Sequence, residues 1–462
     1  MAHSTQKRYA NTRNITAKAP ASVCDILIIG GGPAGMAAAT SAKLSHPDSE
    51  IVILEKNEIL GRKLRATGNG RCNITNTCAD GYEEVIAFLF SLGIATKSKE
   101  RGFVYPVSES APDVAELLEL RLEQLGIKVY KGATVSAVSV VPYCDKQDRP
   151  LDGASFNSGI SFKTVFTIAG IDNDYRMESQ ALVIAAGGKS APVYGATGDG
   201  FLLARSLGHS VTRTVPSLTP VECGNSELTG LSGVRVRATA KLLKDGEQLY
   251  EENGEVQFTK YGLSGICIFN LSRMMRFGKG EGFDNFDMSL DVTDGFNLSE
   301  WLTAAAKRAV VNRETVDARN SQRSAIEANS AVCENSSYNK LVEVFMTVYK
   351  EGLAVEIIRQ AGLDYTSNAS ILTDADVRDK IIRSASDLRF KPTGLKGWKE
   401  AQCTSGGVDM HEIDDESFES KLLPKLYIVG ETLDYDGFCG GYNLNHAFLS
   451  GKRAGEAAAR EI

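Results

Sequence analysis

The sequence predicts an α/β chain in which a doubly wound parallel sheet is interrupted by an insertion of β hairpins and helices. Near the N-terminus, a buried apolar run leads through a glycine-rich turn into an alanine-rich segment, within Asp25–Ser45. A second strand, glycine turn and helix pattern closes the chain from Lys425 onward. Between them, from Val234 to Leu242, apolar and polar residues alternate strictly, which is typical of an antiparallel strand and not of a βαβ unit.

The N-terminal pattern has the spacing of a Rossmann-like dinucleotide-binding turn. Ile26–Ile29 is typical of a strand buried on both faces, and Gly30-x-Gly32-x-x-Gly35 follows it directly. The first glycine permits the tight turn, the second lets the backbone approach a pyrophosphate, and the third lets the helix pack on the strand. We therefore expect a dinucleotide cofactor at this turn.

The residues beside this motif refine the expectation. Pro33 and Ala34 suit the first helical turn, whose free amides would face the phosphates. Glu55 ends the next predicted strand, Ile51–Glu55, about twenty residues on. Its carboxylate would accept hydrogen bonds from a ribose 2′-hydroxyl and repel a 2′-phosphate. FAD or NAD is therefore favoured over NADP at this turn.

The segment after Glu55 is rich in glycine and in basic or asparagine side chains. It has too little apolar surface to form core, and it can bring amides and cations against an extended pyrophosphate. A solvated basic loop is the alternative interpretation. The cofactor contacts expected here are Lys56, Arg62, Lys63, Asn69, Gly70, Arg71, Cys72 and Asn73.

The C-terminal strand ends in a second glycine turn, at Gly430 and Glu431. Ligands bind outside the carboxyl ends of parallel strands, so this turn should face the same crevice as the first. Glu431 could accept a hydrogen bond from a ribitol hydroxyl, and the following helix start could hold the electron-rich end of a flavin. The further cofactor contacts expected at strand ends and at this helix are Val135, Gly187, Gly441, Tyr442 and Asn443.

Four motifs together resemble a family of bacterial FAD-dependent oxidoreductases, usually described as aminoacetone-oxidase-type flavoproteins or 3-dehydro-bile-acid reductases. The resemblance spans roughly Asp25 to Gly455 and implies an FAD-binding fold interrupted by a β-barrel domain and a small helical domain. The chain departs from it at Asn445-His446, where relatives are expected to have Gln-Trp. The motifs are Gly61–Asn76, Phe258–Gly265, Glu400–Val408 and Gly430–Leu444.

The helices and strands between the two glycine turns are predicted from the spacing of apolar residues and from turn residues. Asp113–Gly126 is an amphipathic helix with an acidic start and a closing glycine, and strands are expected at 127–130, 134–140, 162–168 and 180–185. Turns at Asp245-Gly246 and Asn253-Gly254 should divide the inserted sheet into hairpins, and helices are expected at 298–312, 338–361 and 374–384. We predict a disordered extension at 1–22, an FAD-binding domain at 23–210 and 390–462, a β-barrel or meander domain at 211–295 and a helical domain at 296–389.

Composition narrows the class of protein. With 462 residues and a net charge of −7, the chain has no basic excess that would favour nucleic acid or an anionic membrane surface as a partner. No apolar run is long enough to span a bilayer, and residues 1–22 lack the apolar core of a secretory signal. The nine cysteines have no Cys-x-x-Cys spacing, so we expect no metal site, no disulfide framework and a cytoplasmic location.

The chain has no second Gly-x-Gly-x-x-Gly motif that would form a separate nicotinamide domain. Any NADH or NADPH should therefore dock transiently over the flavin as reductant, or the substrate itself is the reductant. Reduction of an enone also needs a donor that polarises the carbonyl and an acid that protonates the α-carbon. Tyr442 and His446, four residues apart on one helical face, are the catalytic candidates.

Three classes of function remain open. The first is NAD(P)H-dependent reduction of a C=C bond in a small hydrophobic enone, such as a 3-oxo steroid or a bile-acid-like molecule. The second is a flavin oxidase that acts on a small amine with dioxygen as acceptor. The third is a non-catalytic or nucleic-acid-associated flavoprotein. The mild acidity of the chain disfavours the third class.

Overall fold

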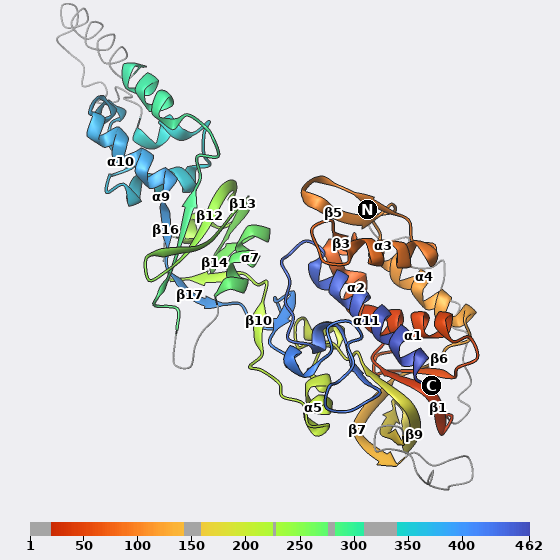
Figure 1. Ribbon diagram of the computed structural model, residues 1–462. Helices are drawn as coiled ribbons and strands as arrows, with labels where there is room; N and C mark the ends of the chain where they lie inside the picture. The colour runs from red at the N-terminus through yellow and green to blue at the C-terminus, as the bar shows by residue number, and fades with distance from the viewer. Residues whose placement is uncertain (1–19, 143–158, 225–227, 276–281, 309–339) are drawn as a thin grey trace, which may run out of the picture.

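A computed structural model describes residues 20–142, 159–224, 228–275, 282–308 and 340–462. Most of the predicted N-terminal extension, the end of the helix expected at 298–312 and the start of the one expected at 338–361 lie outside these residues. Two bodies are visible, each built on its own sheet, and the first combines the two ends of the chain (Figure 1). Among the described residues, no helix is long and apolar enough to cross a membrane.

The first body is built on a parallel sheet with the strand order β6-β2-β1-β9-β19. Ile26–Ile29 pair in parallel with Ile51–Leu54 on one side and with residues 181–184 on the other. This confirms the predicted α/β Rossmann-type fold. The strands are β1 (Val23–Ile29), β2 (Ile51–Glu55), β6 (Lys128–Lys131), β9 (Ile171–Ile184) and β19 (Leu426–Ile428).

The long strand β9 joins two kinds of pairing. Its second half is part of the parallel sheet, whereas its first half pairs in antiparallel fashion with β8 (Ile160–Ile168), which in turn pairs with β7 (Ala133–Pro142). The strands expected at 134–140, 162–168 and 180–185 are therefore present. The sequence did not show that the last of them begins at Ile171.

Helix α1 (Pro33–Ser45) packs closely against α11 (Tyr442–Arg460), which joins the two ends of the chain (Figure 1). Gly451 and Gly455 make this possible, because a Cβ atom at these positions would lie 2.1 and 2.2 Å from backbone oxygens of α1. The other elements of this body are α2 (Arg62–Ala66), β3 (Thr75–Asn76), α3 (Tyr82–Ser91), β4 (Thr96–Ser98), β5 (Phe103–Pro106), α4 (Ala111–Gln124), α5 (Asp199–Ser206), β10 (Val215–Ser217) and β18 (Cys403–Ser405).

The second body is built on an antiparallel sheet with the strand order β16-β15-β12-β13-β14-β11-β17. Its two outermost strands are separated in sequence by Lys391 alone. Helices α9 and α10 lie at its far end from the first body (Figure 1). The elements are β11 (Val221–Cys223), α6 (Leu228–Leu231), β12 (Arg235–Lys244), β13 (Glu247–Thr259), β14 (Gly262–Ser264), α7 (Ile266–Met274), β15 (Phe286–Asp291), α9 (Glu351–Gln360), α10 (Ala375–Ser386), β16 (Leu388–Phe390) and β17 (Pro392–Leu395).

Two expected elements differ from the structure. The turn at Asp245-Gly246 is present, but Asn253-Gly254 lies inside β13 and makes no turn. Gly254 instead leaves room for helix α7, because a Cβ atom there would lie 3.1 Å from the Cβ of Cys267. The helix expected at 338–361 is a short 3₁₀ helix at Leu341–Phe345 followed by α9, since Lys350 between them has extended backbone angles.

Each body has its own hydrophobic core. The first core combines buried residues from 24–207 with others from 408–459, and the second combines residues from 221–390. The segments far apart in sequence thus share one interior, as the two glycine turns suggested. The residue boundaries of the domains, the barrel and a separate helical domain stay predictions.

Candidate cofactor and active site

A cavity of about 670 Å³ runs along the carboxyl ends of the parallel strands. One part of its wall is the glycine turn after β1. Another part is Leu218, which precedes β11, and Ile266, the first residue of helix α7. Both bodies therefore contribute to the wall of one cavity.

Most of the predicted cofactor residues line this cavity. Four of them do not belong to its wall: Gly35, Gly70, Cys72 and Tyr442. Those that line it are Gly30, Gly32, Pro33, Ala34, Glu55, Lys56, Arg62, Lys63, Asn69, Arg71, Asn73, Val135, Gly187, Gly430, Glu431, Gly441 and Asn443, together with His446.

The three glycines of the first turn have different surroundings. Gly30 has a φ of +108°, and a Cβ atom there would lie 2.4 Å from the carbonyl oxygen of Ala185. A Cβ atom at Gly35 would lie 1.9 Å from the oxygen of Gly30, so this glycine allows the close packing of α1. Gly32, the N-cap of α1, has nothing within 4 Å of that position. Open space therefore faces the free amides of the helix start, where a phosphate would be stabilised.

Glu55 is buried at the edge of this space. One carboxylate oxygen accepts a hydrogen bond from the amide of Gly31 at 2.7 Å, and the other accepts from the backbone and side-chain nitrogens of Asn57. A carboxylate offers about four lone-pair sites, so a hydroxyl of a ligand can still be accepted. The fixed position of the Glu55 carboxylate suits the ribose contact that the sequence predicts.

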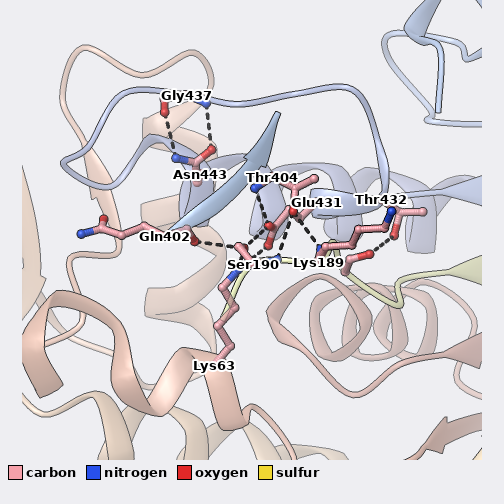
Figure 2. A network of polar contacts seen from close by, with 10 residues as sticks. Lys63, Lys189, Ser190, Gln402, Thr404, Glu431, Thr432, Gly437 and Asn443 are labelled. Atoms are coloured by element: carbon pink, nitrogen blue, oxygen red, sulfur yellow. Dashed lines mark hydrogen bonds and ion pairs between the residues drawn. The ribbon is translucent and has the colours of Figure 1, made fainter. Parts of the chain in front are cut away.

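Glu431 lies at the centre of a polar network that links three segments (Figure 2). Lys63 donates to one of its carboxylate oxygens at 2.6 Å, and the other oxygen accepts from the hydroxyl of Ser190 at 2.5 Å and from the amide of Thr404 at 2.8 Å. Lys63 also donates to Ser190. Sequence reasoning missed Ser190 and Thr404, because only the fold brings the segments after β9 and at β18 beside Glu431.

The turn before α11 is held by the side chain of Asn443 and by close packing on β3. Gly437 and Asn443 exchange two hydrogen bonds, at 2.8 and 2.9 Å (Figure 2). Gly441 has a φ of +103°, and a Cβ atom there would lie 2.4 Å from the carbonyl carbon and oxygen of Thr75. The start of α11 is therefore packed directly on β3.

Two side chains of helix α7 fix the same turn from the second body. Asn270 accepts a hydrogen bond from the amide of Cys439 at 2.7 Å, and Arg273 donates to the carbonyl of Asp436 at 2.6 Å. The guanidinium of Arg273 also lies over the ring of Phe438, 4.5 Å from its centre. The i, i+3 spacing of Asn270 and Arg273 places them on one helical face, but the sequence does not reveal which turn they contact.

The two predicted catalytic residues have different surroundings. The ring of Tyr442 packs edge-on against Phe438, and burial raises the pKa of its phenol. His446 lines the cavity, stacks on Tyr435 with 3.9 Å between ring centres, and contacts Phe418 edge-on. Burial lowers the pKa of His446 to about 4, so its imidazole is neutral at neutral pH. Their catalytic roles stay predictions.

Several features of the wall fit an FAD molecule. Asn73 Oδ1 and His446 Nε2 are buried without a hydrogen-bond partner in the protein, and both residues line the cavity. Buried polar atoms normally have partners, so these two indicate a polar ligand. Gly32 leaves space at a helix start, and Glu55 is fixed beside it. The residues present therefore suit a dinucleotide with a polar ring system.

Within the described residues, no group of three or more His, Cys, Asp or Glu side chains could hold a metal ion. Cys72, expected to contact the cofactor, has a φ of +60° and lies buried behind the wall, and burial raises the pKa of its thiol to about 12. Its inert thiol and that of the exposed Cys78 are both free.

Comparison with known proteins places the chain in one family. The model described as "HI0933-like protein Rossmann domain" matches residues 24–83 and 79–457. A 3-dehydro-bile acid Δ(4,6)-reductase from Clostridium scindens is 31% identical over 94% of this chain and 98% of the relative. Ribosomal RNA dihydrouridine synthases from Escherichia coli and Haemophilus influenzae are 26% and 24% identical, each over 92% of this chain and 96% of the relative.

The matching solved structures are more distant in sequence. A 3-ketosteroid-Δ4-(5α)-dehydrogenase from Rhodococcus jostii RHA1 has 14% identity and a TM-score of 0.44, with 96% of this chain and 98% of that chain covered. A flavocytochrome c3 fumarate reductase in its open conformation has 16% identity and a TM-score of 0.44, with 96% and 79% covered. The family match and the reductase relative confirm the resemblance found in the sequence. The chain belongs to the HI0933-like family and is an oxidoreductase with a Rossmann-type FAD-binding fold.

Proposed function

We propose that this protein is a cytoplasmic, FAD-dependent reductase that uses NADH or NADPH to reduce a C=C bond conjugated to a carbonyl in a small hydrophobic enone. The relatives support the reaction class. A bile acid Δ(4,6)-reductase and a dihydrouridine synthase both saturate a C=C bond, and in a 3-oxo-Δ4 ring as in uracil that bond is conjugated to a carbonyl.

The observation that carries the proposal is the composition of the cavity wall. The wall that begins with the glycine turn and Glu55 also includes a group of apolar and aromatic side chains from several segments, namely Phe103, Leu218, Ile266, Phe438 and Leu444. Ile266 is 46% exposed although it is apolar. Ligand sites typically combine such an apolar wall with a few fixed polar groups. A hydrophobic substrate is suited to this surface.

Residues of the first body would hold the cofactor. The amides at the start of α1, next to Gly32, would face the pyrophosphate, and Glu55 would face the adenosine ribose. Lys63 and Glu431 would face the ribitol chain that leads to the flavin ring. When bound, FAD supplies hydride transfer. The protein binds and orients both molecules and keeps water from the apolar part of the cavity.

The cofactor is tested first. Heat denaturation of the purified protein should release FAD and not FMN, because Glu55 and the α1 amides bind the part that FMN lacks. Glu55→Arg should weaken FAD binding by a few kcal/mol, since hydrogen bonds to a charged group are worth roughly 1.5–3 kcal/mol each. Protein that stays colourless with added FAD would contradict the proposal.

The reaction is tested by separating its two halves under anaerobic conditions. NADH or NADPH should bleach the flavin absorbance, and a 3-oxo-Δ4 steroid should restore it with formation of the saturated ketone. Reduction by a small amine, together with reoxidation by dioxygen but by no enone, would support an amine oxidase instead.

A uridine-containing RNA is the second candidate substrate, because two relatives are ribosomal RNA dihydrouridine synthases. The net charge of −7 favours the small molecule, since phosphate contacts dominate RNA affinity. Reoxidation of the reduced protein by a ribosomal RNA transcript, with dihydrouridine as product, would decide for RNA. A 3-oxo-Δ4 steroid that reoxidises the flavin while the transcript does not would decide for the enone.

A further inference from the structure

We propose that Cys439 donates the proton that completes reduction of the C=C bond, an inference that rests on the function proposed above. Reduction of a conjugated C=C bond needs one hydride at the β-carbon and one proton at the α-carbon. The sequence favoured Tyr442 and His446 for the proton. Tyr442 does not belong to the cavity wall and His446 is a neutral buried imidazole, whereas Cys439 is part of the wall.

Cys439 is held by one contact at its backbone and one at its thiol. Its backbone amide donates to Asn270 Oδ1 at 2.7 Å, and its Sγ lies 3.1 Å from Oε1 of Gln402. The amide group of Asn270 is itself oriented, because its Nδ2 donates to Glu252 at 2.7 Å. An amide oxygen only accepts hydrogen bonds, so the Cys439 thiol carries its hydrogen toward Gln402. Gln402 lines the cavity as well, so this S–H···O contact lies in the cavity wall.

The thiol stays protonated at neutral pH. Burial raises the pKa of Cys439 to about 12, and the negative charge of Glu252 adds to the effect. A reactive nucleophilic thiol would need the opposite environment, with a nearby cation or a lowered pKa. An enolate, which forms when hydride adds to the β-carbon of an enone, is more basic than a thiolate. Transfer of the Cys439 proton to that carbon is therefore downhill.

A second, independent observation indicates a bound molecule beside this turn. His446 lies seven residues after Cys439, lines the same cavity, and has a buried Nε2 without a partner. Asn73, also on the wall, has a buried Oδ1 without a partner. Buried polar atoms are rarely left unpaired, so these two atoms point to ligand atoms in the cavity that Cys439 faces.

The step balances with NADH or NADPH as the reductant and water as the source of the proton. The β-carbon receives two electrons as hydride from the reduced cofactor, which NADH or NADPH has reduced. The S–H bond of Cys439 breaks as the new C–H bond forms at the α-carbon, and the thiolate then takes a proton from water. The net reaction consumes one NAD(P)H and one proton for each C=C bond that is saturated.

Tyr435 is the main competitor for this role. Tyr435 also lines the cavity, and burial raises the pKa of its phenol. Its ring, however, is stacked flat on His446, with 18° between the ring planes. The experiment therefore compares variants of Cys439 and Tyr435 directly.

The first experiment follows reoxidation of the chemically reduced full-length holoprotein by a 3-oxo-Δ4 steroid. Cys439→Ala should slow this step by at least about tenfold, since a positioned acid contributes about 10²–10⁴-fold. Its FAD content and its reoxidation by dioxygen should match those of the wild type, because neither needs a proton at carbon. Cys78→Ala, which removes an exposed free thiol outside the cavity wall, is the matched control and should change nothing.

A second readout needs no turnover. Labelling by a neutral maleimide, mapped by mass spectrometry, should reach Cys439 at least about a hundredfold more slowly than Cys78 at pH 8, and a saturated 3-oxo steroid should protect Cys439 only. Cys439→Ala that reoxidises at the wild-type rate, with Tyr435→Phe slowed instead, would overturn the assignment. Labelling of Cys439 as fast as that of Cys78 would do the same. If no enone reoxidises the wild type, the proposed function itself fails, and the two failures are thus distinguished.

Discussion

The two glycine turns that begin α1 and α11 look alike in sequence but differ physically. Gly32, the N-cap of α1, has a φ of −77°, and an added Cβ atom would meet nothing within 4 Å. Gly441, the N-cap of α11, has a φ of +103°, and its added Cβ atom would lie 2.4 Å from backbone atoms of Thr75. One glycine preserves space for a ligand, whereas the other permits contact within the protein.

This difference assigns the two turns different tasks. The first turn has open space before free helix amides, which is what an anionic group needs. The second is a packed joint that fixes Cys439 and His446 in the cavity wall. Substitutions at the second turn should therefore mainly change the free energy of unfolding, and those at the first should mainly change cofactor affinity.

The largest expected effect is that of Gly441→Ala on stability. The new methyl group meets the Thr75 backbone, and the left-handed backbone angle is unfavourable for alanine, so we expect a loss of roughly 2–5 kcal/mol in the free energy of unfolding. Chemical denaturation measures it. Gly208→Ala is the matched control, because Gly208 has a φ of +96° and open space around it. Equal losses in the two variants would show that packing on Thr75 contributes nothing.

The next effect is the dependence of stability on pH, which we expect from His446 near the start of α11. Because burial lowers the pKa of His446 to about 4 from an unfolded value of 6.5, the unfolded chain binds more protons between these two values. Stability should therefore fall by up to about 3 kcal/mol as pH decreases from 6.5 to 4. His446→Phe keeps a ring against Tyr435 and should flatten this slope relative to the wild type. An unchanged slope would mean that folding does not lower the pKa of His446.

A smaller effect is expected at an ion pair in the cavity wall, outside both turns. Lys63 on α2 and Glu431 after β19 form an ion pair whose side chains are 29% and 20% exposed. Lys63→Met should lower the free energy of unfolding by roughly 1–2 kcal/mol, because it leaves a largely buried carboxylate with fewer partners. The exposed pair of Lys391 with Asp287 provides the control, and Lys391→Met should cost roughly 0–1 kcal/mol. Equal losses of unfolding free energy in the two variants would show that the Lys63–Glu431 pair stabilises the fold no more than an exposed ion pair does.

The smallest effect on stability is expected at the first turn. Gly32→Ala meets no atom and requires no unusual backbone angle, so the free energy of unfolding should stay within about 0.5 kcal/mol of the wild type. FAD affinity should nevertheless fall by at least about tenfold, because the methyl group occupies the space before the α1 amides. Calorimetric titration of the FAD-free variant with FAD measures the affinity. An unchanged affinity would place the pyrophosphate elsewhere.

The sequence predicted the fold of the first body well, for a local reason. Each strand, glycine turn and helix of the nucleotide-binding unit is contiguous, so spacing alone identified Gly30, Gly32, Gly35 and Glu55. The same reasoning was wrong at Asn253-Gly254, where a glycine serves the packing of Cys267 and makes no turn. A turn and a close helix contact both favour glycine, and only the neighbour distinguishes them.

The site shows the same division between local pattern and tertiary contact. The sequence by itself determined the chemistry of the two strand ends, because the amides, carboxylates and glycines that bind a dinucleotide occur at fixed spacings. Only the tertiary structure decided that Ser190 and Thr404 hold Glu431, that Asn270 fixes Cys439, and that Tyr442 lies outside the cavity wall. These contacts join segments up to 241 residues apart in the sequence. The periodicity of a sequence predicts local elements, but it does not predict which side chains of distant segments come into contact.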